Sequence, residues 1–232
     1  MSGVDTILQR TDMEITRTPQ ALCDWVDSKT SALSKTEDGK RFARSGALLP
    51  KKLWEEVRPL GLFARHRYGS RSDVKCTPNL NNENYDGRID FDNTSIPSVY
   101  VEITYAKDGY DESLRLEVLS KNGSVNALGT ISISGTKASG RRTVDVENEA
   151  VDRDVTRHKA LEIVRQRIIG KSGKNYGPNH ILVIVVDDSL LFRTEDDCAI
   201  LVKYAKSIVD SANMDFKEIF LLGSSGNYLC PI

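Results

Sequence analysis

Acidic side chains in two β-prone segments are the residues of this sequence that could bind a cation. In the alternating segment 85–91, Asp86 and Asp90 share one face, because successive strand side chains point to opposite sides. In the segment 99–105, Glu102 and Thr104 share a face for the same reason. If the two faces coincide, two or three carboxylates converge, which is unfavourable unless a cation binds or a pKa rises. Oxygen ligands of this kind suit Mg²⁺ or Mn²⁺, whereas a hairpin face exposed to solvent would need neither ion.

A helix predicted over 111–120 brings two further charged side chains towards this cluster. Glu112 and Arg115 are three residues apart and fall within the arc of apolar side chains that the helix would bury. Inward-facing charges need partners, because an isolated buried ion is costly. The two residues therefore either form a structural salt bridge or belong to a catalytic site beside Glu102.

Other patterns that could bind phosphate are incomplete. The segment 135–142 has the two-glycine spacing of a phosphate loop but lacks the Lys-Ser or Lys-Thr pair that must follow. The string Gly-Lys-Ser at 170–172 has that pair but follows a helix, so both segments are predicted to be turns. Asp187 and Asp188 end an apolar run. Carboxylates there either face a ligand crevice, as in a hydrolase or transferase for small phosphorylated molecules, or cap a helix.

The elements that must position these residues alternate between helices and strands. Periodicity and end signals predict helices over 19–33, 50–59, 111–120, 152–169 and 196–212, and strands over 62–68, 85–91, 99–105, 181–186 and 218–222. The uninterrupted apolar run at 181–186 is typical of a strand covered on both faces. A polar stretch at 34–46 is predicted to be a surface loop.

This order of elements predicts a single α/β domain over 19–232, with a mixed central sheet flanked by helices. Residues 1–18 are polar and lack periodicity, so a flexible N-terminal arm is expected there. β-Branched pieces separated by glycines predict a β-hairpin excursion near 124–147.

The composition is ordinary, but its charge is unevenly distributed. The 232 residues include 32 Lys and Arg and 33 Asp and Glu, for a net charge of −1, which argues against a uniformly basic nucleic-acid coat. Segment 83–117, however, carries nine acidic and three basic side chains, whereas 58–75 carries five basic and one acidic, and 153–174 seven basic and two acidic. An acidic centre between basic flanks fits a metal site inside a phosphate-binding rim, although a solvated basic helix face would give the same pattern.

Targeting signals are not found in the sequence. No run approaches the roughly 18 apolar residues of a membrane span, and no secretory signal pattern is present. The four cysteines are far apart, which predicts separate thiols instead of disulfides or a zinc site. We therefore expect a cytoplasmic protein without membrane partners.

The order of the elements resembles the PD-(D/E)XK nuclease superfamily. A helix with Glu55 and Glu56, a strand, an Asp-bearing hairpin, a strand with Glu-x-Thr and a helix follow one another over roughly residues 50–120, with a further strand at 181–186. The resemblance implies a restriction-endonuclease-like domain with an αβββαβ core.

That resemblance also implies roles for individual residues. Asp86 and Glu102 would be the motif carboxylates that bind the catalytic metal. Thr104 stands where the superfamily has a lysine, which is a departure from the pattern. Lys107 or Arg115 would then have to supply the missing cation.

The chain also looks like a bacterial family of uncharacterised proteins. This second resemblance covers most of the chain and rests on the strings Tyr-Asp-Gly at 85–87, Val-Glu-Ile-Thr at 101–104, Asp-Gly-Tyr-Asp-Glu at 108–112, Leu-Arg at 114–115, Gly-Thr-Lys at 135–137 and Tyr-Gly-Pro at 176–178. It implies no activity.

The leading hypothesis is a metal-dependent nuclease, or a nuclease-derived nucleic-acid-binding protein, with Mg²⁺ or Mn²⁺ as cofactor. Nucleic acid requires basic side chains beside the acidic centre, and the candidates are Arg65, Arg67, Arg71, Arg157 and Arg165. The alternative is a non-catalytic interaction or regulatory protein on the same fold, which Thr104 in the lysine position favours. Both classes are compatible with a homo-oligomer.

Overall fold

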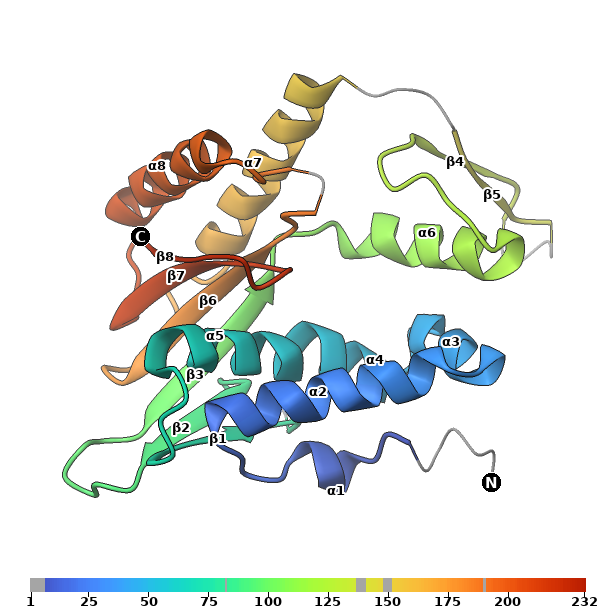
Figure 1. Cartoon of the computed structure of the whole chain (residues 1–232). Helices are drawn as coiled ribbons and strands as arrows, with labels where there is room; N and C mark the ends of the chain where they lie inside the picture. Colours follow the sequence, from blue (N-terminus) through green and yellow to red (C-terminus); the bar gives the residue numbers. More distant parts are fainter. Residues whose placement is uncertain (1–6, 82, 137–140, 148–151, 190) are drawn as a thin grey trace.

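A six-stranded mixed sheet forms the centre of the single α/β domain (Figure 1). The structure is a computed structural model that describes residues 7–81, 83–136, 141–147, 152–189 and 191–232. The strands lie in the order β1-β2-β3-β6-β7-β8, with the bounds β1 Val74–Pro78, β2 Gly87–Phe91, β3 Val99–Tyr105, β6 His180–Val186, β7 Glu218–Gly223 and β8 Leu229–Pro231. The first three are antiparallel, β3, β6 and β7 are parallel, and β8 returns antiparallel at the edge. The mixed sheet expected from the sequence is thereby confirmed.

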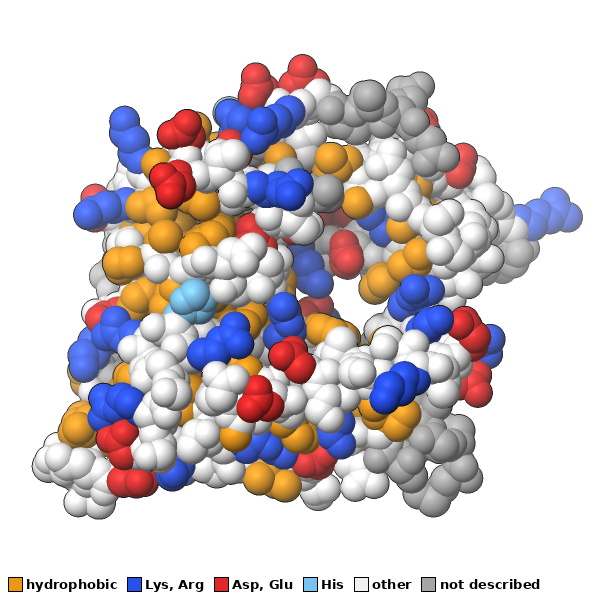
Figure 2. Space-filling model, viewed as in Figure 1, with side chains coloured by type: hydrophobic (Ala, Val, Ile, Leu, Met, Phe, Trp, Pro, Cys, Tyr) orange, Lys and Arg blue, Asp and Glu red, His pale blue; other side chains and the backbone are white. Residues whose placement is uncertain are grey.

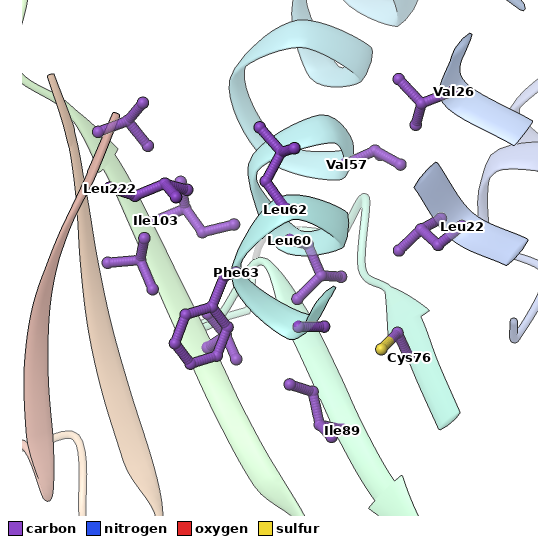
Figure 3. Packing of buried hydrophobic residues seen from close by; sticks show 14 of the residues in the cluster. Leu22, Val26, Val57, Leu60, Leu62, Phe63, Cys76, Ile89, Ile103 and Leu222 are labelled. Carbon is purple, nitrogen blue, oxygen red and sulfur yellow. The ribbon is translucent and has the colours of Figure 1, made fainter. Parts of the chain in front are cut away.

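Helices cover both faces of the sheet. Helices α2 (Pro19–Ser34) and α5 (Arg58–Tyr68) pack on one face, and α7 (Arg153–Ile169) and α8 (Glu195–Ser211) pack on the other. Strands β6 and β7 divide their side chains between these two cores; in β6, for example, Val183 belongs to the first core and Leu182 to the second. Both faces of β6 are therefore buried, which explains its uninterrupted apolar sequence. Figure 3 shows the first core, where side chains of α2 and α5 meet those of the sheet.

The helix before β1 continues past a proline. Helix α4 (Leu48–Lys52), the π-helical turn η1 (Leu53–Val57) and α5 follow one another without a break. The helix end expected near Pro59 and the strand expected over 62–68 were therefore wrong. Pro59 has no amide hydrogen to donate to the carbonyl four residues earlier, and the wider π-turn just before it accommodates that loss. Residues 34–46 were likewise expected to form a loop, but they contain helix α3 (Glu37–Arg44), capped by the Thr36 hydroxyl.

The segment before α2 is attached to the domain. It contains the short helix α1 (Arg10–Met13), and both Leu8 and Met13 are buried in the first core. Further along, Arg17 and Cys76 exchange two backbone hydrogen bonds of 3.0 and 2.7 Å, which extends the edge of the sheet beyond β1. The flexible arm expected over 1–18 is therefore wrong for residues 7–18, and residues 1–6 lie outside the described part of the chain.

A small second sheet stands apart from the central one. Helix α6 (Gly109–Asn122) follows β3, and β4 (Ile131–Ser134) pairs antiparallel with β5 (Thr143–Val146) against it. This is the hairpin expected near 124–147. Among the residues that the structure describes, no helix combines the length and apolarity needed to cross a bilayer.

Candidate active site

Two carboxylates meet where strand β2 begins beside β3. Gly87 pairs with Val101, so the same register continued by one residue places Asp86 opposite Glu102. The Asp86 amide donates to the Val101 carbonyl at 2.8 Å, and the Asp86 Oδ2 atom accepts the Ile103 amide at 2.7 Å. The Asp86 side chain thus replaces a backbone acceptor at the start of β2, and this fixes it beside Glu102.

A third acidic group comes from the π-turn. Glu56 forms an ion pair with Lys52, with 2.7 Å between Nζ and Oε1. Its other oxygen, Oε2, is buried and has no hydrogen-bond partner among the described residues. A buried carboxylate oxygen without a hydrogen bond is energetically unfavourable and calls for an explanation. In addition, π-turns frequently occur at functional sites. Glu56, which the sequence analysis placed in the helix of the resemblance but not among the site residues, is therefore a candidate ligand.

Burial and neighbouring charges raise the pKa values of two of these acidic groups, Asp86 and Glu56. Burial, followed by the charges of Glu102 and Glu56, raises the pKa of Asp86 to about 7, although the Ile103 amide opposes the rise. Burial also raises the pKa of Glu56, against the attraction of Lys52. Acidic groups with raised pKa values that share one small volume are typical of functional sites.

A lysine distant in sequence completes the cluster. Lys171, in the loop after α7, forms an ion pair and a hydrogen bond with Glu102, whose side chain is 12% exposed while that of Lys171 is 19% exposed. Burial alone would lower the pKa of Lys171, but the hydrogen bond and charge of Glu102 outweigh it and raise the pKa. Burial and the charge of Glu102 likewise raise the pKa of Tyr176 nearby. No sequence pattern indicates this role of Lys171, since its Gly-Lys-Ser string predicts only a turn.

An open cleft of about 630 Å³ lies beside the cluster. Its walls come from the π-turn, the end of β3, the start of α6 and one side chain of α7, with Glu55, Glu56, Ile103, Thr104 and Arg167 among the lining residues. Figure 2 shows a hollow in the middle of this face, with both basic and acidic side chains at its edge. Of the three acidic groups of the cluster, Glu56 is the one that lines the cleft.

The remaining candidate residues divide between this cleft and other roles. Thr104, Lys107 and Glu112 line the cleft, and the Lys107 ammonium lies 3.0 Å from Glu55. Arg115 instead donates to the Gly129 carbonyl at 2.8 Å, which fastens the hairpin segment to α6. Of the two inward charges expected on this helix, only Glu112 faces the cleft.

Asp90 and the acidic pair at the end of β6 are occupied elsewhere. Asp90 binds Arg88 at 2.9 Å and the Ser98 hydroxyl at 2.6 Å, so it is separate from the Asp86 cluster. Asp188 is buried and accepts hydrogen bonds from the Ser225 amide, at 2.8 Å, and from two serine hydroxyls in the β7–β8 turn. Asp187 accepts hydrogen bonds from Ser189. These contacts give Asp188 a structural role.

The arginines expected to bind nucleic acid do not line the cleft. Four of the five are paired with carboxylates: Arg67 with Glu218, Arg71 with Asp73, Arg157 with Asp154 and Asp197, and Arg165 with Glu162. Arg65 is half-buried in the last turn of α5. Of the two basic segments, 153–174 reaches the site, through Arg167 in the cleft and Lys171 on Glu102.

No ready-made metal cluster is present in the described part of the chain, where no group of three or more His, Cys, Asp or Glu side chains is arranged to hold an ion. Comparisons with known protein families, with curated proteins and with solved structures found no match. The chemistry of the site must therefore be argued from its own residues.

Proposed function

We propose that this protein is a metal-dependent nuclease with a restriction-endonuclease-like domain. One observation carries the proposal: Asp86 and Glu102 lie side by side on neighbouring strands, next to Glu56 and with Lys171 bound to Glu102. The antiparallel β1-β2-β3 meander followed by the parallel strand β6 agrees with the αβββαβ core that the resemblance implies.

In this proposal Asp86, Glu102 and Glu56 are the residues that would hold a divalent cation such as Mg²⁺ or Mn²⁺, after the side chains move from the arrangement described above. Mg²⁺ takes oxygen ligands at about 2.1 Å, and carboxylates are its usual protein ligands. Glu56 offers a buried oxygen that lacks a partner, and Asp86 has a pKa of about 7, which a bound cation would lower. When bound, such an ion lowers the pKa of a coordinated water and neutralises phosphate charge.

Lys171 is the residue that we propose in place of the lysine missing at Thr104. Its ammonium group lies on Glu102, where it could stabilise negative charge that develops on a phosphodiester. Lys107 is bound to Glu55, and Arg115 is bound to the Gly129 carbonyl, so both are less suited to that role. The proposal therefore replaces these two candidates with Lys171.

A second candidate function is a non-catalytic binding or regulatory protein on the same fold. One observation favours it: the ion pair with Lys171 already neutralises Glu102 without any metal. A degenerate site could be held together in this way after losing its catalytic ion. The two candidates differ in whether a divalent cation binds at all.

The test is divalent-cation binding followed by cleavage. Mn²⁺ binding is measured by calorimetry on the wild type, Asp86→Asn and the control Glu162→Gln, which alters an exposed carboxylate on α7. We expect one site in the wild type and the control, no binding by Asp86→Asn, and Mn²⁺-dependent nicking of a plasmid or cleavage of oligonucleotides. A wild type that binds no Mn²⁺ and cleaves nothing would contradict the nuclease and leave the binding protein.

A further inference from the structure

The loop that joins α7 to β6 is fastened to the loop that joins α8 to β7. In the second loop, one oxygen of the Asp215 carboxylate accepts the amides of Tyr176 and Gly177, at 2.8 and 2.9 Å. The Gly173 amide also donates to the Asn213 carbonyl at 3.0 Å. Hydrogen bonds to a charged acceptor are stronger than those between neutral groups, so Asp215 is the main anchor between the two loops.

The Tyr176 side chain carries this anchorage to the central sheet. It is 8% exposed, and its ring centroid lies 4.2 Å from that of Phe216 and 5.9 Å from that of His180. His180 begins β6 and pairs with Tyr100 of β3, and the two rings stack at 5.0 Å. Because Tyr100 and Glu102 share one face of β3, Tyr176 packs on the face of the sheet that carries Glu102.

Tyr176 borders the ion pair between Lys171 and Glu102. Burial, followed by the charge of Glu102, raises the pKa of Tyr176, whereas the charge and hydrogen bond of Lys171 lower it. A lysine side chain is long and flexible, so an ion pair holds it in one position only when its surroundings restrict it. The Tyr176 side chain supplies such a restriction beside the Lys171 ammonium.

We propose that Asp215 is a positioning residue that holds Lys171 on Glu102 through Tyr176. What it supplies is an oxygen acceptor for two consecutive amides of the α7–β6 loop. Without that acceptor, Tyr176 is released from the sheet and Lys171 leaves Glu102 for solvent. The catalytic meaning of the inference rests on the proposed nuclease function, because Lys171 is the cation that the proposal assigns to the phosphodiester.

The reactivity of the Lys171 amine reports its position and does not require cleavage. A limiting amount of acetic anhydride acetylates the folded protein in metal-free buffer, and mass spectrometry of its peptides gives the relative rates. The rate of Lys171 is divided by that of Lys174, which is exposed on the same loop. We expect this ratio to rise about fivefold or more in Asp215→Ala, the factor that corresponds to one lost hydrogen bond. Asp215→Asn keeps an oxygen acceptor, so its ratio should stay close to that of the wild type.

The matched control is Asp188→Ala, which lies at the opposite end of β6. Asp188 also accepts a backbone amide, that of Ser225 at 2.8 Å, so its loss lowers stability without removing an anchor of the α7–β6 loop. The reactivity ratio of this control should equal that of the wild type. An unchanged ratio in Asp215→Ala, or an equal rise in Asp188→Ala or in Asp215→Asn, would overturn the proposal.

Cleavage assays separate this inference from the nuclease. With saturating Mn²⁺, Asp215→Ala should lower kcat by about tenfold or more and leave KM unchanged, because a misplaced cation weakens stabilisation of the transition state but not binding of the oligonucleotide. A rise in Lys171 reactivity without any cleavage by the wild type would reject the nuclease and keep this inference. Cleavage by the wild type together with unchanged Lys171 reactivity in Asp215→Ala would do the reverse.

Discussion

Replacing Asp86 with asparagine should stabilise the folded protein at neutral and alkaline pH, although it removes a residue of the proposed site. The carboxyl group is held beside Glu102 and Glu56, and burial is the largest cause of its raised pKa. Asparagine has almost the same shape and can still accept the Ile103 amide, which Asp86 binds at 2.7 Å. The substitution therefore removes the charge and keeps the hydrogen bond.

The magnitude follows from the pKa of Asp86 in the folded state, about 7, against 3.8 for the free group. Below pH 3.8 the Asp86 carboxyl group is protonated in both the folded and the unfolded protein, so it does not change the free energy of unfolding. Between the two values the folded state keeps a proton that the unfolded state releases, so the wild type loses stability as pH rises. The loss reaches at most about 4 kcal/mol above pH 7, since each pKa unit corresponds to about 1.4 kcal/mol.

Urea unfolding in metal-free buffer measures this effect. At about pH 8, Asp86→Asn should exceed the wild type in free energy of unfolding, and by about pH 4 the difference should shrink to nearly zero. The control is Asp73→Asn, because the hydrogen bond with Arg71 lowers the pKa of Asp73, so its removal should not stabilise. An Asp86→Asn protein that is no more stable than the wild type at the higher pH would refute the argument that this carboxylate carries an electrostatic cost.

Three further predictions concern the same region and the strand ends near it. Lys171→Met should lower the free energy of unfolding by about 3 kcal/mol because it leaves Glu102 without its partner, and adding Glu102→Gln should restore part of the loss; urea unfolding of the two variants checks this. Asp188→Ala should cost about 2–4 kcal/mol in thermal unfolding, because it leaves three donors of the β7–β8 turn without an acceptor, whereas Asp187→Ala should cost much less. Mn²⁺ at about 100 times its dissociation constant should stabilise the wild type by about 2.7 kcal/mol, and an equal gain in Asp86→Asn would place the ion elsewhere.

Much of the sheet could be predicted because its strands have local signatures. The apolar run of β6 and the β-branched sequence of β3 identified both strands within a residue or two. Alternation within 85–91 and 99–105 also brought Asp86 and Glu102 together as candidates, since only short-range register was needed. The proximity of these two carboxylates was thus accessible from sequence.

The features that were predicted wrongly, or not predicted at all, depend on contacts between distant segments of the chain. Lys171 reaches Glu102 across 69 residues of sequence, and no spacing rule connects them. Helix α5 continues through Pro59 because a π-turn absorbs the missing hydrogen bond and Phe63 is buried against the sheet. Residues 7–18 are held against the domain by Leu8 and Met13, whose side chains are buried in the first core. In each case tertiary packing outweighed local preference.

The nuclease centre is tested by the rate at which a labelled oligonucleotide is cleaved with saturating Mn²⁺. We expect cleavage by the wild type and by Glu162→Gln, and a rate at least about 100-fold lower for Glu102→Gln, because a group that stabilises the transition state is lost. Circular dichroism of all three proteins confirms that they are folded. Equal rates for the wild type and Glu102→Gln, or no cleavage by the wild type, would contradict the claim that Asp86, Glu102 and Lys171 form a nuclease centre.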